Sequence, residues 1–105
     1  MIYSPKILWF EDQKYVYFTL QYTSNVLYIY IQLINNVLYI YCEFLNNISF
    51  FKIKLVHDTY VYYKSINNKY VYIYLYKQIK KLWYCLSRYN TNLRIYRDWI
   101  NYIDI

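Results

Sequence analysis

Apolar and polar residues alternate with a period of two along much of this chain, the spacing of side chains on one face of a β-strand. β-Branched and aromatic residues occupy many of the alternating positions. These runs predict strands at residues 26–34, 48–56, 59–66 and 70–77, with a shorter one at Leu93–Tyr96. In residues 70–77 the alternation directs Val71, Ile73 and Leu75 to the core and the tyrosines between them outward.

A helical period is also present in two places. Val37, Ile40, Tyr41 and Phe44 share one helical stripe after an Asn pair that suits a helix cap, which predicts a helix over residues 37–45. Residues 15–22 fit a helix or a strand, and the acidic start at residues 11–12 favours a helix. Trp99, Tyr102 and Ile103 lie at helical spacing near the end of the sequence.

The predicted fold class is therefore α+β, with helices packed on a mainly antiparallel sheet. Residues 1–78 would form an N-terminal helix-strand-helix-strand lobe, followed by a basic, β-rich C-terminal segment at residues 79–105. A chain of 105 residues has room for one compact unit, so we expect the two parts to be continuous.

The composition limits both the turns and the possible functions. The chain has 19 tyrosines, no glycine and no alanine. Turns that need a positive φ must therefore use Asn or Asp, which marks the pairs Asn35-Asn36, Asn46-Asn47 and Asn67-Asn68 as turns. Glycine-rich phosphate loops and dinucleotide-binding fingerprints are excluded. Residues with A/T-rich codons dominate, which indicates an AT-rich genome, organellar or parasite-like. Of these we expect an organelle-encoded protein of the mitochondrial matrix.

Positive charge is confined to one half of the chain. Residues 1–63 have no net charge, whereas residues 64–105 carry eight lysines and arginines against two aspartates, a net charge of +6. Such a one-sided basic half is typical of proteins that bind a polyanion, either nucleic acid or an anionic membrane surface. A lysine-rich solvated surface imposed by codon usage is the alternative interpretation.

Few residues suit catalysis or metal binding. His57 is the one histidine, and its neighbour Asp58 lies in a predicted turn, so a triad with Ser49 or Ser65 has no support from spacing. Cys42 and Cys85 lie in apolar patterns that predict buried free thiols. We expect no enzyme, no cofactor, no metal and no small-molecule substrate.

Residues 26–45 have about the length of a membrane span. The Asn pair near the middle and the glutamate at position 43 are costly in a bilayer, so a strand followed by a helix is favoured over a span.

The tyrosine face of residues 70–76 fits two interpretations: base stacking, or cross-strand packing against Tyr60 and Tyr62, of which the second is the more ordinary. The tract from Ile79 onward interleaves cations with apolar anchors, a pattern suited to phosphate contacts.

The run LSRYNTNLRIYRDW in that tract resembles the centre of the bacterial-type small-subunit ribosomal protein eight family. Ser87-Arg88 and the strand Leu93–Tyr96 match the family's pattern, and Asn36–Ile53 is similar to its helix, break and following Phe-Lys-Ile strand. The sequence departs from the family in having two extra residues in the turn at 89–92 and no counterpart of the Ser-Thr-Ser-rich C-terminal loop.

The resemblance implies a structural protein of a mitochondrial small ribosomal subunit that binds ribosomal RNA and neighbouring small-subunit ribosomal proteins. The expected RNA-binding residues are Lys52, Lys54, Lys80, Lys81, Ser87, Arg88, Arg94, Tyr96 and Arg97. The alternative is a lineage-specific accessory subunit of a mitochondrial inner-membrane respiratory or ATP synthase complex, with one span at residues 26–45.

Overall fold

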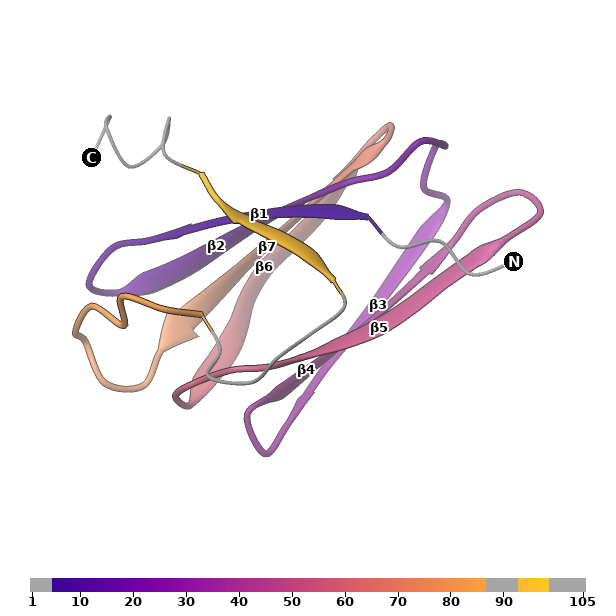
Figure 1. Ribbon diagram of the computed structural model, residues 1–105. Helices are drawn as coiled ribbons and strands as arrows, with labels where there is room; N and C mark the ends of the chain where they lie inside the picture. The colour runs from indigo at the N-terminus through magenta and orange to yellow at the C-terminus, as the bar shows by residue number, and fades with distance from the viewer. Residues whose placement is uncertain (1–4, 87–92, 99–105) are drawn as a thin grey trace.

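The computed structural model describes residues 5–86 and 93–98, which form a sandwich of two β-sheets (Figure 1). One sheet has five strands in the order β6-β7-β2-β1-β8, and the other has three in the order β3-β4-β5. Neighbouring strands are antiparallel except β1 and β8, which are parallel. The strands are β1 (Lys6–Glu11), β2 (Tyr15–Gln21), β3 (Tyr28–Ile34), β4 (Val37–Glu43), β5 (Ile48–Lys54), β6 (Thr59–Asn67), β7 (Tyr70–Lys77) and β8 (Arg94–Arg97).

The predicted α+β class is wrong, because none of the described residues forms a helix and the fold is all-β. Residues 37–45, expected to be helical, contain β4. Asn35 and Asn36 both have positive φ, 50° and 66°, and they join β3 to β4 in a two-residue turn. Such turns match the twist of paired strands and form hairpins. The Asn pair is therefore a hairpin turn and not a helix cap.

Residues 15–22 are also not a helix, because they contain strand β2. Val16, Phe18 and Leu20 are buried on its inner face, so the period-two pattern decides the structure. The side chain of Asp12 accepts hydrogen bonds from the backbone N–H groups of Lys14 and Tyr15, at 2.8 and 2.7 Å. The acidic residue therefore closes the turn between β1 and β2.

The other predicted strands are confirmed, with ends that differ by a few residues. Val71, Ile73 and Leu75 are fully buried, as the alternation predicted. Asn68, with φ of 56°, makes the turn between β6 and β7. Residues 26–45, the candidate membrane span, form the β3–β4 hairpin, and the part of the chain that the structure describes contains no helix long and apolar enough to cross a membrane.

The inner faces of both sheets supply one hydrophobic core. The five-stranded sheet contributes Phe18 and Ile73, among others, and the three-stranded sheet contributes Leu38, Ile40 and Ile53. Each such side chain stabilises the fold by about 1.5–3 kcal/mol on burial. The outer faces of the two sheets remain in contact with solvent.

Residues 78–86 form no strand but pack on this core. Trp83 and Leu86 are buried, and the backbone N–H of Val56 donates to the carbonyl of Leu86 at 3.2 Å. With β8 paired to β1, the described residues of the expected C-terminal segment share the core of the N-terminal lobe. Trp99, Tyr102 and Ile103 lie outside the described residues.

Candidate nucleic-acid interface

The outer face of the five-stranded sheet carries a row of aromatic rings that crosses four strands. Phe10 of β1 stacks on Tyr17 of β2 with ring centroids 4.4 Å apart. Tyr17 meets Tyr74 of β7 edge-on at 5.0 Å, and Tyr74 meets Tyr63 of β6 at 5.0 Å. The row exists because each strand places alternate residues outward and the register aligns them.

A second cluster lies beside this row. Tyr15 contacts Tyr76 at 5.4 Å and Tyr62 at 5.2 Å, and it also contacts Tyr17 of the first row at 5.9 Å. The rings at the β6 side stay accessible: Tyr62 is 64% exposed and Tyr63 46%. Cross-strand packing is therefore present, but the β7 ring Tyr74 packs against Tyr63 of β6 and not against the expected Tyr60 or Tyr62. The packing also leaves aromatic surface open. We call the outward residues of this sheet the tyrosine face; its aromatic members are Phe10, Tyr15, Tyr17, Tyr60, Tyr62, Tyr63, Tyr70, Tyr72, Tyr74, Tyr76 and Tyr96.

Cations border the tyrosine face at two places. The Lys6 ammonium lies 5.5 Å from the centre of the Tyr96 ring, and Lys6 is paired in register with Arg94 on the edge strand β8. At the other place, Lys80 lies 5.6 Å from the centre of the Tyr76 ring. The hydrogen bond with Tyr76 raises the pKa of Lys80, so this side chain is cationic at neutral pH. Rings and cations at this spacing can bind bases and phosphates together.

The carboxylate of Asp12 lies at one end of the tyrosine face, at the turn between β1 and β2. Tyr17 donates its hydroxyl hydrogen to Asp12 Oδ2 at 2.7 Å. Partial burial, followed by this hydrogen bond, raises the pKa of Tyr17 well above its ordinary value. The hydroxyl therefore stays protonated and holds the ring in place.

A buried ion pair holds residues 78–86 against the sheet, and the sequence did not predict it. Lys77 Nζ lies 2.6 Å from Glu11 Oε1, with both side chains almost fully buried. Glu11 also accepts hydrogen bonds from the backbone N–H groups of Trp83 and Tyr84, at 2.6 and 2.9 Å. Glu11 was expected to start a helix, and its inward place on β1 follows only from the strand alternation. Because the pair fixes the segment that carries Lys80, it positions one of the border cations.

The predicted RNA-binding residues do not all lie on one surface. Lys80, Arg94 and Tyr96 lie at the tyrosine face, and Lys81 is exposed in the same segment as Lys80. Lys52 and Lys54 are instead on β5, where they point outward from the three-stranded sheet. Lys54 donates to the carbonyl of Asn35 at 2.9 Å. Ser87 and Arg88 lie outside the described residues.

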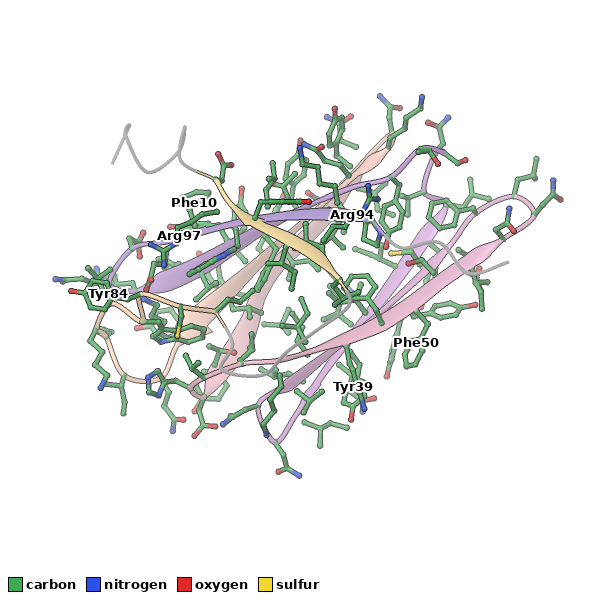
Figure 2. All side chains as sticks on the ribbon, viewed as in Figure 1. Phe10, Tyr39, Phe50, Tyr84, Arg94 and Arg97 are labelled. Carbon is green, nitrogen blue, oxygen red and sulfur yellow. The ribbon has the colours of Figure 1, made fainter. Side chains whose placement is uncertain are left out.

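Arg97 does not lie on the tyrosine face, because its side chain contacts other parts of the fold. Its guanidinium lies 4.8 Å from the centre of the Trp9 ring and donates to the carbonyl of Tyr84. Figure 2 shows Arg97 and Tyr84 close together at the end of the sandwich, whereas Arg94 lies at the other end of β8. Arg97 thus links β8 to the segment that the buried ion pair fixes.

The three-stranded sheet has an aromatic outer face of its own. Tyr39 and Phe50 are approximately parallel, with centroids 6.5 Å apart, and Figure 2 shows them on the side of β5 away from the five-stranded sheet. Tyr28 and Tyr30 are each 50% exposed. Lys52 and Lys54 belong to this face, so it offers a matched comparison for tests of the tyrosine face.

The residues considered for catalysis do not form a triad. Ser49 is fully buried and lies 2.9 Å from the Tyr22 hydroxyl, while His57 packs against Trp83 at 5.7 Å. Cys42 is buried as expected, but Cys85 is exposed, because residues 78–86 form no strand to turn it inward. Within residues 5–86 and 93–98, no cluster of His, Cys, Asp and Glu could hold a metal ion. Comparisons of the sequence with models of known protein families and with curated proteins find no match.

Proposed function

We propose that this protein binds single-stranded RNA on the tyrosine face of its five-stranded sheet, as a non-catalytic component of an RNA–protein assembly. The observation that carries the proposal is the aromatic row from Phe10 to Tyr63 beside the cations Lys6, Lys80 and Arg94. Sheets with exposed rings bind unstacked bases, whose faces are hidden in a duplex. A single strand is thus the form of RNA that suits this surface.

Charge supports the same conclusion. The chain carries a net charge of +6, and five of its twelve lysines and arginines fall within residues 80–97. Phosphate contacts by such cations provide affinity without reading the sequence, while each stacked base adds about 1–3 kcal/mol. We therefore expect tight binding with little sequence preference and a strong dependence on salt.

For the biological setting we propose the small subunit of a mitochondrial ribosome, with ribosomal RNA and neighbouring ribosomal proteins as partners. The setting has its support in the sequence, through the resemblance of residues 86–99 to the ribosomal family and the basic half of the chain. The helix that the resemblance implied at residues 37–45 is strand β4, so the fold adds no support to it.

The RNA site is tested with fluorescent oligouridine and the full chain. Tyr62→Ala and Tyr63→Ala should each weaken binding by about tenfold, because a base loses its stacking partner. The matched control is Tyr30→Ala, an equally exposed tyrosine on the three-stranded sheet, which should bind as the wild type does. Equal loss in all three variants, or no loss in the first two, would contradict the proposed site.

The setting is tested by sedimentation of an organelle lysate with and without magnesium chelation. A ribosomal protein travels with the small subunit and leaves the heavy fractions when magnesium is removed. Comigration with a respiratory complex that ignores magnesium would instead favour the inner-membrane alternative. Oligouridine binding and sedimentation can fail independently, so the site and the setting are tested separately.

A further inference from the structure

Three connections meet at one end of the sandwich, at the upper right of Figure 1. They are the segment 22–27 and the turns at residues 44–47 and 67–69, which together we call the loop end. The backbone N–H of Leu27 donates to the carbonyl of Glu43 at 2.8 Å, and that of Val26 donates to the carbonyl of Asn68 at 2.9 Å. The segment 22–27 therefore connects the two turns and fixes their relative positions.

Two exposed leucines lie on neighbouring connections of the loop end. Leu45 is 84% exposed, more than any other large apolar side chain among the described residues, and Leu27 is 62% exposed. Both line the same groove of about 500 Å³, whose lining residues are all uncharged. Single exposed apolar residues are common on protein surfaces, but two on adjacent loops can enter an apolar phase together.

The position of Leu45 is fixed by the residues around it. Phe44 is buried, and its ring packs edge-on against Tyr22 with centroids 4.9 Å apart. The backbone N–H of Phe44 also donates to the carbonyl of Asn47 at 2.9 Å, which closes the turn. Because Phe44 is anchored in the core, the turn holds Leu45 outward before any partner binds. A contact made by Leu45 therefore costs little ordering of the turn.

Cations surround these leucines. Lys69 is exposed in the turn between β6 and β7, and its carbonyl accepts from the backbone N–H of Tyr22 at 2.9 Å. Lys6 and Arg94 are paired in register at the starts of β1 and β8, and Lys6 is also paired with Gln21, at the same end of the sheet. Both side chains are exposed. The loop end thus presents positive charge from three elements.

Most of the described acidic residues lie at the opposite end of the sandwich, beside the β1–β2 turn, residues 77–84 and the end of β8; they are Glu11, Asp12, Asp58 and Asp98. Glu43 is the one described acid next to the loop end. Its carboxylate accepts a hydrogen bond from the hydroxyl of Tyr41, two residues back along β4, at 2.9 Å. This bond directs the carboxylate toward the outer face of the three-stranded sheet and away from Leu45.

Tyrosines lie behind the leucines on both outer faces. Tyr28 begins β3 and is 50% exposed, and Tyr70 begins β7 and is 42% exposed. From the loops toward the sheets the order is therefore leucine, then tyrosine and cations. The surface of an anionic bilayer presents acyl chains, then headgroups where tyrosine and cations are favoured. An RNA would bind the cations but offers no apolar phase to the leucines.

We propose that the loop end binds an anionic lipid surface. Leu27 and Leu45 enter the boundary between headgroups and acyl chains, while Lys69, Lys6 and Arg94 contact the anionic headgroups. The contact is peripheral and does not depend on RNA binding. Because Lys6 and Arg94 also border the tyrosine face, the tests use the leucines and Lys69.

The first test is cosedimentation of the full chain with vesicles. We expect binding to phosphatidylcholine vesicles that contain about 30% phosphatidylserine, and binding about tenfold weaker to phosphatidylcholine alone. Absence of binding to the anionic vesicles, or equal binding to both kinds, would overturn the proposal.

Matched variants separate insertion of the leucines from a general attraction of a basic protein to anionic lipid. Leu27→Asn and Leu45→Asn should each weaken binding to the anionic vesicles by about tenfold, because a leucine no longer enters the apolar phase. The control is Ile79→Asn, since Ile79 is also 62% exposed but lies in the segment 78–86 at the opposite end. None of these changes alters the net charge. Equal losses in Leu27→Asn and Ile79→Asn would show that no leucine inserts.

Charge and depth are tested by two further pairs of variants. Lys69→Gln should weaken binding to the anionic vesicles by about fivefold, while Lys52→Gln on the three-stranded sheet should not. The fluorescence of Leu45→Trp should be quenched by lipids with brominated acyl chains more than that of Ile79→Trp. Quenching that is equal in the two would exclude insertion at residue 45. Leu27→Asn should leave oligouridine binding unchanged, so failure of the lipid site and failure of the RNA site are distinguishable.

Discussion

Lys77 and Glu11 form an ion pair of 2.6 Å in which the side chains are 0% and 2% exposed. The remaining protons of the Lys77 ammonium are donated to the carbonyls of Asp12 and Lys81, at 2.6 and 2.8 Å. The two Glu11 oxygens accept from the backbone of Trp83 and Tyr84. Every polar group of the pair is thus satisfied, which a buried pair requires if it is not to destabilise the fold.

Glu11→Gln should lower the free energy of unfolding by about 3 kcal/mol, because it leaves the Lys77 ammonium buried without a counter-charge. Urea denaturation followed by tyrosine and tryptophan fluorescence measures the change. Glu43→Gln is the matched control, since Glu43 is exposed and its carboxylate accepts a hydrogen bond from the Tyr41 hydroxyl, and it should change stability by less than about 0.5 kcal/mol. If the two variants lowered the free energy of unfolding equally, the buried pair would contribute no more to stability than the exposed Glu43 carboxylate.

We predict that the buried hydroxyl of Tyr22 makes the stability of the fold decrease at alkaline pH. Burial raises the pKa of Tyr22 well above its usual value of 10.0, and the hydroxyl lies 2.9 Å from Ser49 Oγ in the core. In the folded state the hydroxyl stays neutral, while the unfolded chain ionises it. Stability from this group is therefore fully present below pH 10 and is lost as the pH rises above it.

Tyr22→Phe should cost about 1 kcal/mol at pH 7, through loss of the hydrogen bond, and should make the decline above pH 10 less steep. Denaturation curves at a series of pH values measure both effects. The exposed tyrosine Tyr60 serves as the control, because Tyr60→Phe removes a hydroxyl at the surface. A decline equally steep in Tyr22→Phe and the wild type would contradict the assignment to Tyr22.

The β6–β7 turn depends on the residue at position 68. Asn68 has φ of 56°, which costs a β-branched residue about 1–2 kcal/mol, whereas Asn67 beside it is not among the residues with positive φ. Asn68→Val should therefore lower the free energy of unfolding by about 1–2 kcal/mol and Asn68→Gly should be tolerated. Asn67→Val is the neighbouring control, and thermal unfolding compares the three. If Asn67→Val were the more damaging change, the turn assignment would be wrong.

Arg94 should contribute to the salt dependence of RNA binding. Loss of one phosphate contact to a single strand lowers the slope of log K against log salt by about 0.7. Arg94→Gln should show this change in an oligouridine titration at several salt concentrations. Lys52→Gln, on the three-stranded sheet, should keep the wild-type slope. If Lys52→Gln altered the slope and Arg94→Gln did not, the RNA site would lie on the outer face of the three-stranded sheet.

Several local features of this protein are determined by the sequence alone. The alternation in residues 70–77 predicted a strand with Val71, Ile73 and Leu75 inward, and the absence of glycine predicted turns at Asn35-Asn36 and Asn67-Asn68. These succeed because side-chain period and φ preference are local properties. The choice between helix and strand for residues 15–22 and 37–45 was not local, since apolar residues in both runs fit either period.

Tertiary structure alone decided the rest. Residues 37–43 become a strand because β3 and β5 pair on its two sides and bury Leu38, Ile40 and Cys42. The tyrosine face exists because register aligns rings from strands far apart in the sequence. Glu11 meets Lys77 because β7 pairs with β2 and residues 78–86 fold back over the end of β1. No spacing along the chain encodes these contacts, because they depend on which strands become neighbours.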